Sequence, residues 1–261
     1  MTVAAPRRSR GVLVVLTMSR PQGLQRLLES LLHADYAGEN VDLQVEVDVR
    51  PTGPDMPTLR LLGDLRWPHG HKTVNVRVKN VGLAASWISH AWPNPQEGQE
   101  PCVILEDDIT VSSVFWLWLR RGHSLLAGRA DVAGLSLQRP TLRVTDGREL
   151  PQVGPEDRLF LYRLPGSIGF SPRAAVWRDF RTWHRDAAAQ GVDPRVPGLV
   201  TSVWYQRLAR QGRAGSMWTQ WFIRFATERG LYTAYQNPIG GGALAAHWRL
   251  KGEHHNGGGK G

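Results

Sequence analysis

The chain has 261 residues, of which 41% are hydrophobic, and a formal net charge of +9 at pH 7. This length suits one large α/β domain or two small ones, and the apolar content excludes a disordered chain. The charge favours phosphorylated ligands, polyanions or an anionic membrane surface, but the arginines are scattered rather than blocked, which is poor evidence for nucleic-acid binding.

Strand and helix patterns alternate in the first half of the chain. Apolar or period-two patterns predict strands at residues 12–17, 41–49, 74–80 and 102–106. Helices are predicted at 24–34, 54–65, 82–92 and 112–128; Pro21 suits the start of the first, and Ser112 or Ser113 caps the last. The alternation predicts a mainly parallel sheet whose ligands bind beyond the carboxyl ends of the strands.

The second half has a different pattern. Residues 131–140 indicate a strand before a polar loop, and residues 158–172 a strand, a glycine turn and a strand. Tryptophan-rich helices follow at 173–189, 199–211 and 217–230, then a strand at 231–238 and a low-complexity tail. There is no internal repeat, so we predict one domain with a nucleotide-binding first half and an elaborated second half.

Cysteine and hydropathy patterns restrict the setting of the protein. Cys102 is the single cysteine, which excludes an intrachain disulfide, and its place in an apolar run indicates a core residue rather than a nucleophile. No segment has the roughly 18 apolar residues of a membrane helix. The run after the basic N-terminus is too short for a signal peptide. The compartment stays open: the Golgi lumen if an anchor is missing from this chain, otherwise the cytoplasm.

Three acids, Glu106, Asp107 and Asp108, stand where the strand at 102–106 leaves the core, although like charges side by side repel. A helix cap at Asp108 would explain one or two of them. A P-loop NTPase strand would need a GxxxxGK[ST] loop, which the sequence lacks. A haloacid-dehalogenase-type loop would match Glu106, Asp108 and Thr110, but with Glu in place of the nucleophilic Asp.

A divalent cation accounts for the three acids better. Mg²⁺ and Mn²⁺ prefer oxygen ligands and are often held by one or two carboxylates together with substrate phosphates. The charge of such an ion relieves the repulsion between the carboxylates. Acids at a strand end of a basic protein therefore suit a metal that bridges to a diphosphate.

The stretch VILEDDITVSSVFW resembles the EDD-containing segment of GT-A-fold glycosyltransferases, in the N-acetylglucosaminyltransferase I-like and family-2-like group. Further segments are similar to that group in the same order, from about residue 12 to residue 255: GVLVVLTMSRPQGLQRLLESLL, VDLQVEVD, NVGLAASWISHAW, LPGSIGFSPRAAVWRDF, FATERGLYTAYQNP and AAHWRLKGEHH. The resemblance implies a Rossmann-like, mostly parallel sheet flanked by helices in one domain at 11–255. The nucleotide-sugar half would be 11–138, the acceptor half 139–255, and residues 1–10 and 256–261 would be disordered.

The resemblance also implies a reaction: transfer of a hexose or N-acetylhexosamine from a UDP- or GDP-sugar to a glycan, protein or lipid hydroxyl, with inversion. The metal, Mn²⁺ or Mg²⁺, would be held by Asp108 and His247. Donor contacts are expected from Thr17, Arg20, Asp48, Glu106 and Asp107, and Asp107 is also expected to be catalytic. Acceptor contacts are expected from Gly166, Gly169 and Trp218. No nucleic-acid partner is expected.

The chain departs from the family pattern where a catalytic base is expected. The stretch WTQW holds Thr219 and Gln220, which cannot act as bases, where the family has an Asp pair, and AHWRLKG lacks the acid of NHREPG. Glu228, in ERGLY, is the expected base, because a carboxylate must reach the acceptor hydroxyl. The fallback bases are Glu156 and Asp157, whereas the tail histidines His254 and His255 are weaker metal ligands than His247.

Two alternatives to a transferase stay open at this point. The first is a GT-A-like scaffold that binds a donor but has lost its base and catalyses neither transfer nor hydrolysis. The second is a basic nucleotide- or polyanion-binding module, whose binding would be independent of metal and steeply sensitive to salt.

Overall fold

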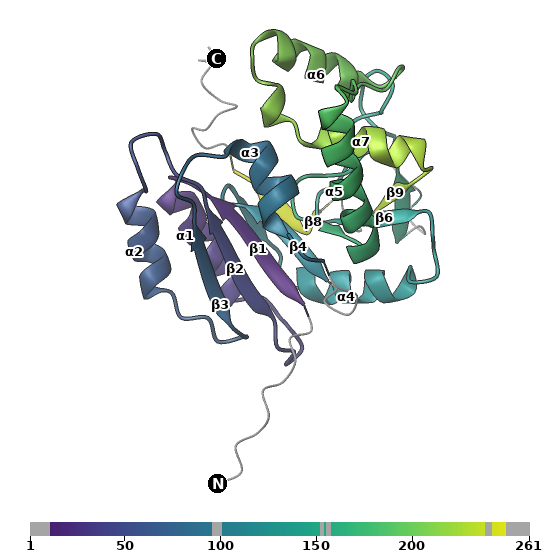
Figure 1. Ribbon diagram of the computed structural model, residues 1–261. Coiled ribbons are helices and arrows are strands. Elements are labelled where there is room, and N and C mark those ends of the chain that lie inside the picture. Colours follow the sequence, from purple (N-terminus) through teal and green to yellow (C-terminus); the bar gives the residue numbers. More distant parts are fainter. Residues whose placement is uncertain (1–10, 96–100, 152–153, 155–157, 238–241, 249–261) are drawn as a thin grey trace, which may run out of the picture.

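The computed structural model describes residues 11–95, 101–151, 154, 158–237 and 242–248, and the account below concerns those residues (Figure 1). The first half contains β1 (Val12–Thr17), α1 (Pro21–Leu32), β2 (Asp42–Val47), α2 (Met56–Asp64), β3 (Lys72–Val76), α3 (Gly82–Ala85), the π-helical turn η1 (Ser86–Ala91) and β4 (Cys102–Glu106). The rest of the first half contains β5 (Ile109–Val111), α4 (Phe115–Leu125) and β6 (Val132–Ser136). The second half contains β7 (Leu159–Tyr162), β8 (Phe170–Pro172), α5 (Ala174–Ala189), α6 (Val200–Arg210), the 3₁₀ turn η2 (Ala214–Ser216), α7 (Thr219–Glu228), β9 (Tyr232–Gln236) and β10 (Ala245–His247).

An eight-stranded sheet joins both halves of the chain, in the order β3-β2-β1-β4-β8-β6-β9-β7. Strands β3, β2, β1 and β4 are parallel to one another, whereas β8 is antiparallel to both β4 and β6. β6 and β9 are parallel, and β7 closes the far edge antiparallel to β9. This arrangement confirms the predicted mixed, mostly parallel α/β sheet flanked by helices.

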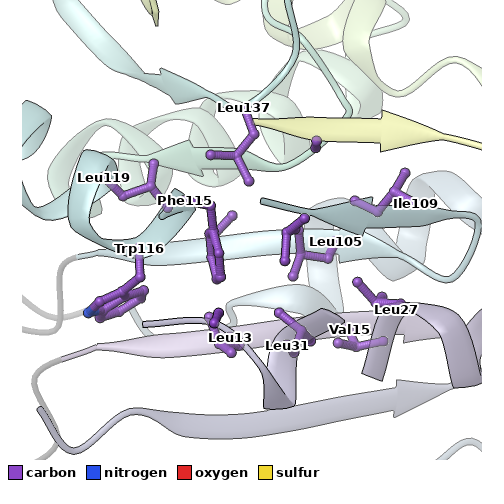
Figure 2. Packing of buried hydrophobic residues seen from close by; sticks show 14 of the residues in the cluster. Leu13, Val15, Leu27, Leu31, Leu105, Ile109, Phe115, Trp116, Leu119 and Leu137 are labelled. Carbon is purple, nitrogen blue, oxygen red and sulfur yellow. The ribbon is translucent and has the colours of Figure 1, made fainter. Parts of the chain in front are cut away.

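Alternate residues of the central strands face two apolar layers. Leu13 and Val15 of β1 pack with α1 and α4, and Figure 2 shows them beside Leu27, Leu31 and Phe115. Val14 and Leu16 face the opposite layer, which η1, α5 and α7 fill with aromatic side chains. A strand buried on both faces gives the continuous apolar run seen in the sequence. Cys102 is buried in the second layer, as predicted.

The segment after the acids differs from the prediction. The α4 helix begins at Phe115 with Val114 as N-cap and no capping side chain, so neither Ser112 nor Ser113 caps it. A cap at Asp108 is also wrong, because the short strand β5 stands between Asp108 and α4. Ile109 and Val111 are buried while β5 pairs antiparallel with β10, and neither strand was predicted because each is three residues long. No helix among the described residues is long and apolar enough to span a membrane.

Candidate functional site

A pocket of about 310 Å³ lies at the carboxyl end of β4, between the two halves of the chain. The first half contributes two of the three acids and the start of α3, and the second half contributes the turn before β8 and the entry to α7. The lining residues are Leu83, Glu106, Asp108, Ile109, Ser167, Ile168, Ser216, Met217, Trp218, Thr219 and His247. Its position matches the general rule that α/β sheets bind ligands beyond their strand ends.

Glu106 ends β4 and lines the pocket. The indole Nε1 of Trp87 donates to its Oε1 at 3.0 Å, and Trp87 stacks on Trp218 with ring centroids 4.2 Å apart. Burial, and then the charge of Asp108, raise the pKa of Glu106 to about 7, against the opposing effects of the Trp87 hydrogen bond and of Arg20. Glu106 is therefore a carboxyl group that exchanges a proton near neutral pH.

Asp107 turns away from the pocket and is 1% exposed. The hydroxyl of Thr17, at the end of β1, donates to Asp107 Oδ2 at 2.6 Å, and the Arg20 guanidinium pairs with Asp107 Oδ1. Arg20 also donates to Asp108 Oδ2 at 2.8 Å. Burial disfavours the charge on Arg20, but Asp107 and Asp108 outweigh it and raise the pKa of this guanidinium. Thr17, Arg20 and Asp107 thus lie in contact with one another, and their predicted contacts with a donor stay a prediction.

Asp108 faces the pocket with a side chain that is 14% exposed. The pairing of β10 with β5 brings His247 to this carboxylate, with His247 Nε2 3.6 Å from Asp108 Oδ2. The backbone N–H of Trp248 donates to the Asp108 carbonyl at 2.7 Å, which fixes β10 beside the acids. The sequence separates these two side chains by more than half the chain, and the fold places them together.

The Asp108–His247 pair fits a divalent cation. No group of three or more His, Cys, Asp or Glu side chains within the described ranges forms a closed metal site. An open site is what Mg²⁺ and Mn²⁺ use when substrate phosphates complete their coordination. Neighbouring ligand atoms of an octahedral ion, each about 2.1 Å from it, lie about 3.0 Å apart, so the observed 3.6 Å would have to shorten slightly for the two side chains to share an ion. Such an ion would have to share Asp108 with Arg20 or displace it.

Asp48 directly follows β2 and is 8% exposed. Its carboxylate accepts hydrogen bonds from the backbone N–H groups of Val49, Val81 and Gly82 at 2.9–3.2 Å, and from the Asn80 amide at 3.3 Å. Asp48 therefore fixes the loop that leads into α3, whose Leu83 lines the pocket. A direct contact between Asp48 and the donor stays a prediction.

The predicted acceptor residues lie in or next to the lining of the pocket. Gly166 and Gly169 bracket Ser167 and Ile168, and a Cβ at Gly169 would stand 2.6 Å from the Leu137 side chain at a φ of +69°. A Cβ at Gly166 would meet Ser136 Oγ at 2.5 Å. Only glycine fits this close turn. Trp218 is buried, and lines the pocket while it stacks on Trp87.

The structure does not bring the expected base to the pocket. Glu228 ends α7 and pairs with Arg224, Nε to Oε1 2.6 Å, whereas the pocket is at the first turn, at Thr219. Nine residues of helix separate the two positions by about 14 Å. Gln220 is buried and donates to the Pro194 carbonyl at 2.9 Å. The other expectations, for Glu156, Asp157, His254 and His255, lie outside the described residues.

Several pocket residues were not predicted from the sequence. Trp87 donates a hydrogen bond to Glu106, but nothing in the sequence distinguishes it from the other ten tryptophans. Ser216 and Met217 enter the pocket through η2, a turn too short to leave a periodic signal. Ser167 could have been found, because it lies between the two glycines of the predicted turn.

Comparison with known proteins identifies the architecture. No protein-family model and no curated protein sequence matches the chain. Among solved structures, TarS 1–349 of S. aureus in complex with UDP-GlcNAc is 12% identical with a TM-score of 0.51, over 94% of this chain and 60% of that one. TarS in a second structure is 13% identical with a TM-score of 0.50, over 87% of this chain and 37% of that one. The mannosyltransferase PcManGT from Pyrobaculum calidifontis, in complex with GDP-Man and Mn²⁺, is 18% identical with a TM-score of 0.39, over 52% of this chain and 38% of that one.

This chain therefore spans 60% or less of the length of the structures it resembles. At these identities the likeness concerns the fold alone. The chain has the GT-A-type α/β fold that its sequence predicted.

Proposed function

We propose that the chain is a metal-dependent glycosyltransferase that moves a sugar from a nucleotide-sugar donor to an acceptor hydroxyl, with inversion at the anomeric carbon. The observation that carries the proposal is the pocket shared by the acids of β4 and the glycine turn of the second half. Asp108 and His247 offer ligands for a metal ion that would bind a diphosphate. Ser167, Thr219 and Trp218 offer hydroxyl and indole groups that suit a sugar. The group it resembles in sequence, near N-acetylglucosaminyltransferase I, makes a UDP-linked donor the first to try.

The donor side depends on the acids and on Arg20. Asp108 and His247 would hold the ion, and Mn²⁺ or Mg²⁺, when bound, supplies positive charge beside the departing diphosphate. Arg20, freed from Asp108, would reach a phosphate oxygen while it remains on the buried Asp107. Glu106, held by Trp87, would accept a hydrogen bond from a donor hydroxyl.

The acceptor side lies across the same pocket. Trp218, Ser167 and Thr219 line the pocket, and their indole and hydroxyl groups would contact the acceptor sugar. The acceptor hydroxyl would attack the anomeric carbon from this side, opposite the diphosphate held by the acids. Approach from opposite sides is the geometry of a single displacement and hence of inversion.

The test is a calorimetric titration of UDP, GDP and their sugars, with and without Mn²⁺. The wild type should bind one nucleotide series only with the metal, and Asp108→Ala should lose that binding. Asp179→Ala, on the exposed surface of α5, is the matched control and should bind as the wild type does. Absence of binding to the wild type under every condition would refute the proposal.

Product analysis then separates the transferase from an inactive scaffold. Under the proposal, incubation with donor and Mn²⁺ releases the nucleotide and gives a product whose anomeric configuration, read by NMR, is inverted. Metal-dependent binding with neither transfer nor hydrolysis would favour the scaffold. Metal-independent binding that falls steeply with salt would favour the polyanion-binding module.

A further inference from the structure

The net charge of the chain is confined to its second half, although no run of basic residues is present. Residues 1–138 contain 14 Lys/Arg and 14 Asp/Glu, whereas residues 139–261 contain 18 Lys/Arg and 9 Asp/Glu. Between residues 139 and 248 every basic residue is an arginine. Arginine binds phosphate and carboxylate groups through two parallel N–H donors, which lysine cannot do. The first half of the chain is therefore balanced in formal charge, and the excess positive charge belongs to the second half.

Three segments of the second half pack into one body. A hairpin closed by a bridge between Leu142 and Glu149 lies against the start of α6, where the Val200 N–H donates to the Val144 carbonyl at 2.9 Å. Val144, Leu164, Val196, Leu199 and Ile223 form an apolar cluster beneath them, separate from the two main layers. We call residues 139–150, 163–168 and 193–217 the arginine lobe.

The arginine lobe carries many more cations than anions. It holds three carboxylates, Asp146, Glu149 and Asp193, and eight arginines, Arg139, Arg143, Arg148, Arg163, Arg195, Arg207, Arg210 and Arg213. Asp146 and Asp193 take ion pairs within the lobe, to Arg143 and Arg195. In the part of the chain that the structure describes, Arg139, Arg163, Arg207 and Arg210 contact no carboxylate, and the last three are exposed.

The arginine lobe forms the acceptor wall of the pocket. Ser167, Ile168, Ser216 and Met217 belong to it and line the pocket. The Ser216 hydroxyl donates to the Arg213 carbonyl at 2.7 Å, so α6 and its arginines lead directly to the pocket edge. On the other side, the Ile168 N–H donates to the side chain of Gln138, next to Arg139, at 3.4 Å.

We propose that the acceptor is an anionic glycan whose phosphodiester or carboxylate groups bind the arginine lobe while one of its hydroxyls enters the pocket. The inference rests on the proposed function, since it names the acceptor class of that same site. The donor diphosphate would not account for these arginines, because its charge would be matched by Arg20 and by a metal held at Asp108. Arginines spread over three segments suit repeated charges along a polymer better than a single anionic group.

The experiment compares binding of the full chain to four immobilised polymers at one salt concentration. They are a phosphomannan with phosphodiester groups, polygalacturonate with carboxylates, neutral dextran, and single-stranded DNA. The two anionic glycans should retain the protein, and dextran should not. The anionic glycan that binds more tightly identifies the acidic group, phosphodiester or carboxylate. The double variant Arg207→Glu/Arg210→Glu should bind that glycan about 30-fold more weakly, as expected for two lost contacts to an anionic surface.

The matched control is Arg60→Glu/Arg66→Glu, which makes the same charge change at exposed positions on and just after α2, and should bind as the wild type does. Three results would overturn the inference. They are an equal loss of glycan affinity in both double variants, retention of the wild type on dextran as strong as on the anionic glycans, or tighter binding to DNA than to either anionic glycan. Nucleotide titration of the α6 variant separates the two proposals. If the donor still binds with the metal but the wild type shows no preference for anionic glycans, only the proposed acceptor class is refuted. If the wild type binds no donor, the proposed transferase function is refuted.

Discussion

Removing Arg20 should reveal how much of the stability of the fold depends on the acids. In Arg20→Met the carboxylate of Asp107, 1% exposed, keeps the Thr17 hydroxyl but loses its only ion pair among the described residues. Breaking a buried pair costs about 3–5 kcal/mol, whereas an exposed pair contributes about 0–1 kcal/mol. Because Arg20 is 28% exposed and Thr17 still donates to Asp107, we expect the free energy of unfolding to fall by about 3 kcal/mol, at the lower end of that range.

For a chain of this size that loss lowers the melting temperature by about 6–9 °C. Differential scanning calorimetry of the apo protein measures it, with Arg224→Met as the matched control because Arg224 pairs with Glu228 at the surface. The control should change the free energy of unfolding by less than about 1 kcal/mol. In an Asp107→Asn background, Arg20→Met should cost little, since no buried charge is then left without a partner.

Mn²⁺ provides a second readout for the same variant. The Arg20 guanidinium would compete with a metal ion for the Asp108 carboxylate. Arg20→Met should therefore bind Mn²⁺ more tightly than the wild type does without nucleotide, and Mn²⁺ should restore part of the lost stability. Equal melting temperatures for Arg20→Met and Arg224→Met, or an undiminished loss in the Asp107→Asn background, would refute the assignment of Arg20 as the counter-ion of a buried carboxylate.

Three other predictions follow from the geometry of the pocket. The pKa of Glu106 rises on folding from 4.5 to about 7, so the folded state binds more protons, and stability should fall by up to about 3 kcal/mol as pH rises through that window. Glu106→Gln should remove this pH dependence of stability, which urea unfolding of the wild type and the variant at pH 5 and pH 8 would measure. An equal change in the free energy of unfolding of both proteins between the two pH values would contradict the argument. Gly169→Ala should cost about 2 kcal/mol in thermal unfolding, because φ is +69° and Leu137 is too close, while Gly215→Ala, in open space, should cost less than half as much. Glu228→Gln should keep the transfer rate within about two-fold, and a loss above about a hundred-fold would restore Glu228 as the base.

The sequence predicted the parts of the fold that depend on local pattern. The runs that became β1, β2 and β4 are apolar because both faces of those strands are covered, and the long amphipathic helices α5, α6 and α7 left a clear period. β5 and β10 are each three residues long and are held by pairing across about 135 positions, so no local pattern shows them. The start of α4 was misplaced for the same reason.

The chemistry of the site was predicted unevenly. The acids drew attention because adjacent carboxylates at the end of an apolar run repel one another, and the roles expected of Arg20 and His247 came from a resemblance. Pattern alone could not show that Asp107 faces Thr17 while its two neighbours face the pocket, since that depends on the register of β4 against β1. The role of Trp87 depends on a π-helical turn where an ordinary helix was predicted.

Three neighbouring carboxylates are tolerated at the end of β4 because Glu106 has a raised pKa, whereas Asp107 and Asp108 share the Arg20 guanidinium. Glu106 faces Trp87 in a buried setting and holds a proton up to about pH 7. Asp107 is buried against a guanidinium and a hydroxyl. Asp108 alone combines access to the pocket with a partner, His247, that can also bind a metal. Each substitution should therefore change a different measured quantity. Glu106→Gln should change the pH dependence of stability, Asp107→Asn the cost in stability of removing Arg20, and Asp108→Ala the metal-dependent binding of nucleotide.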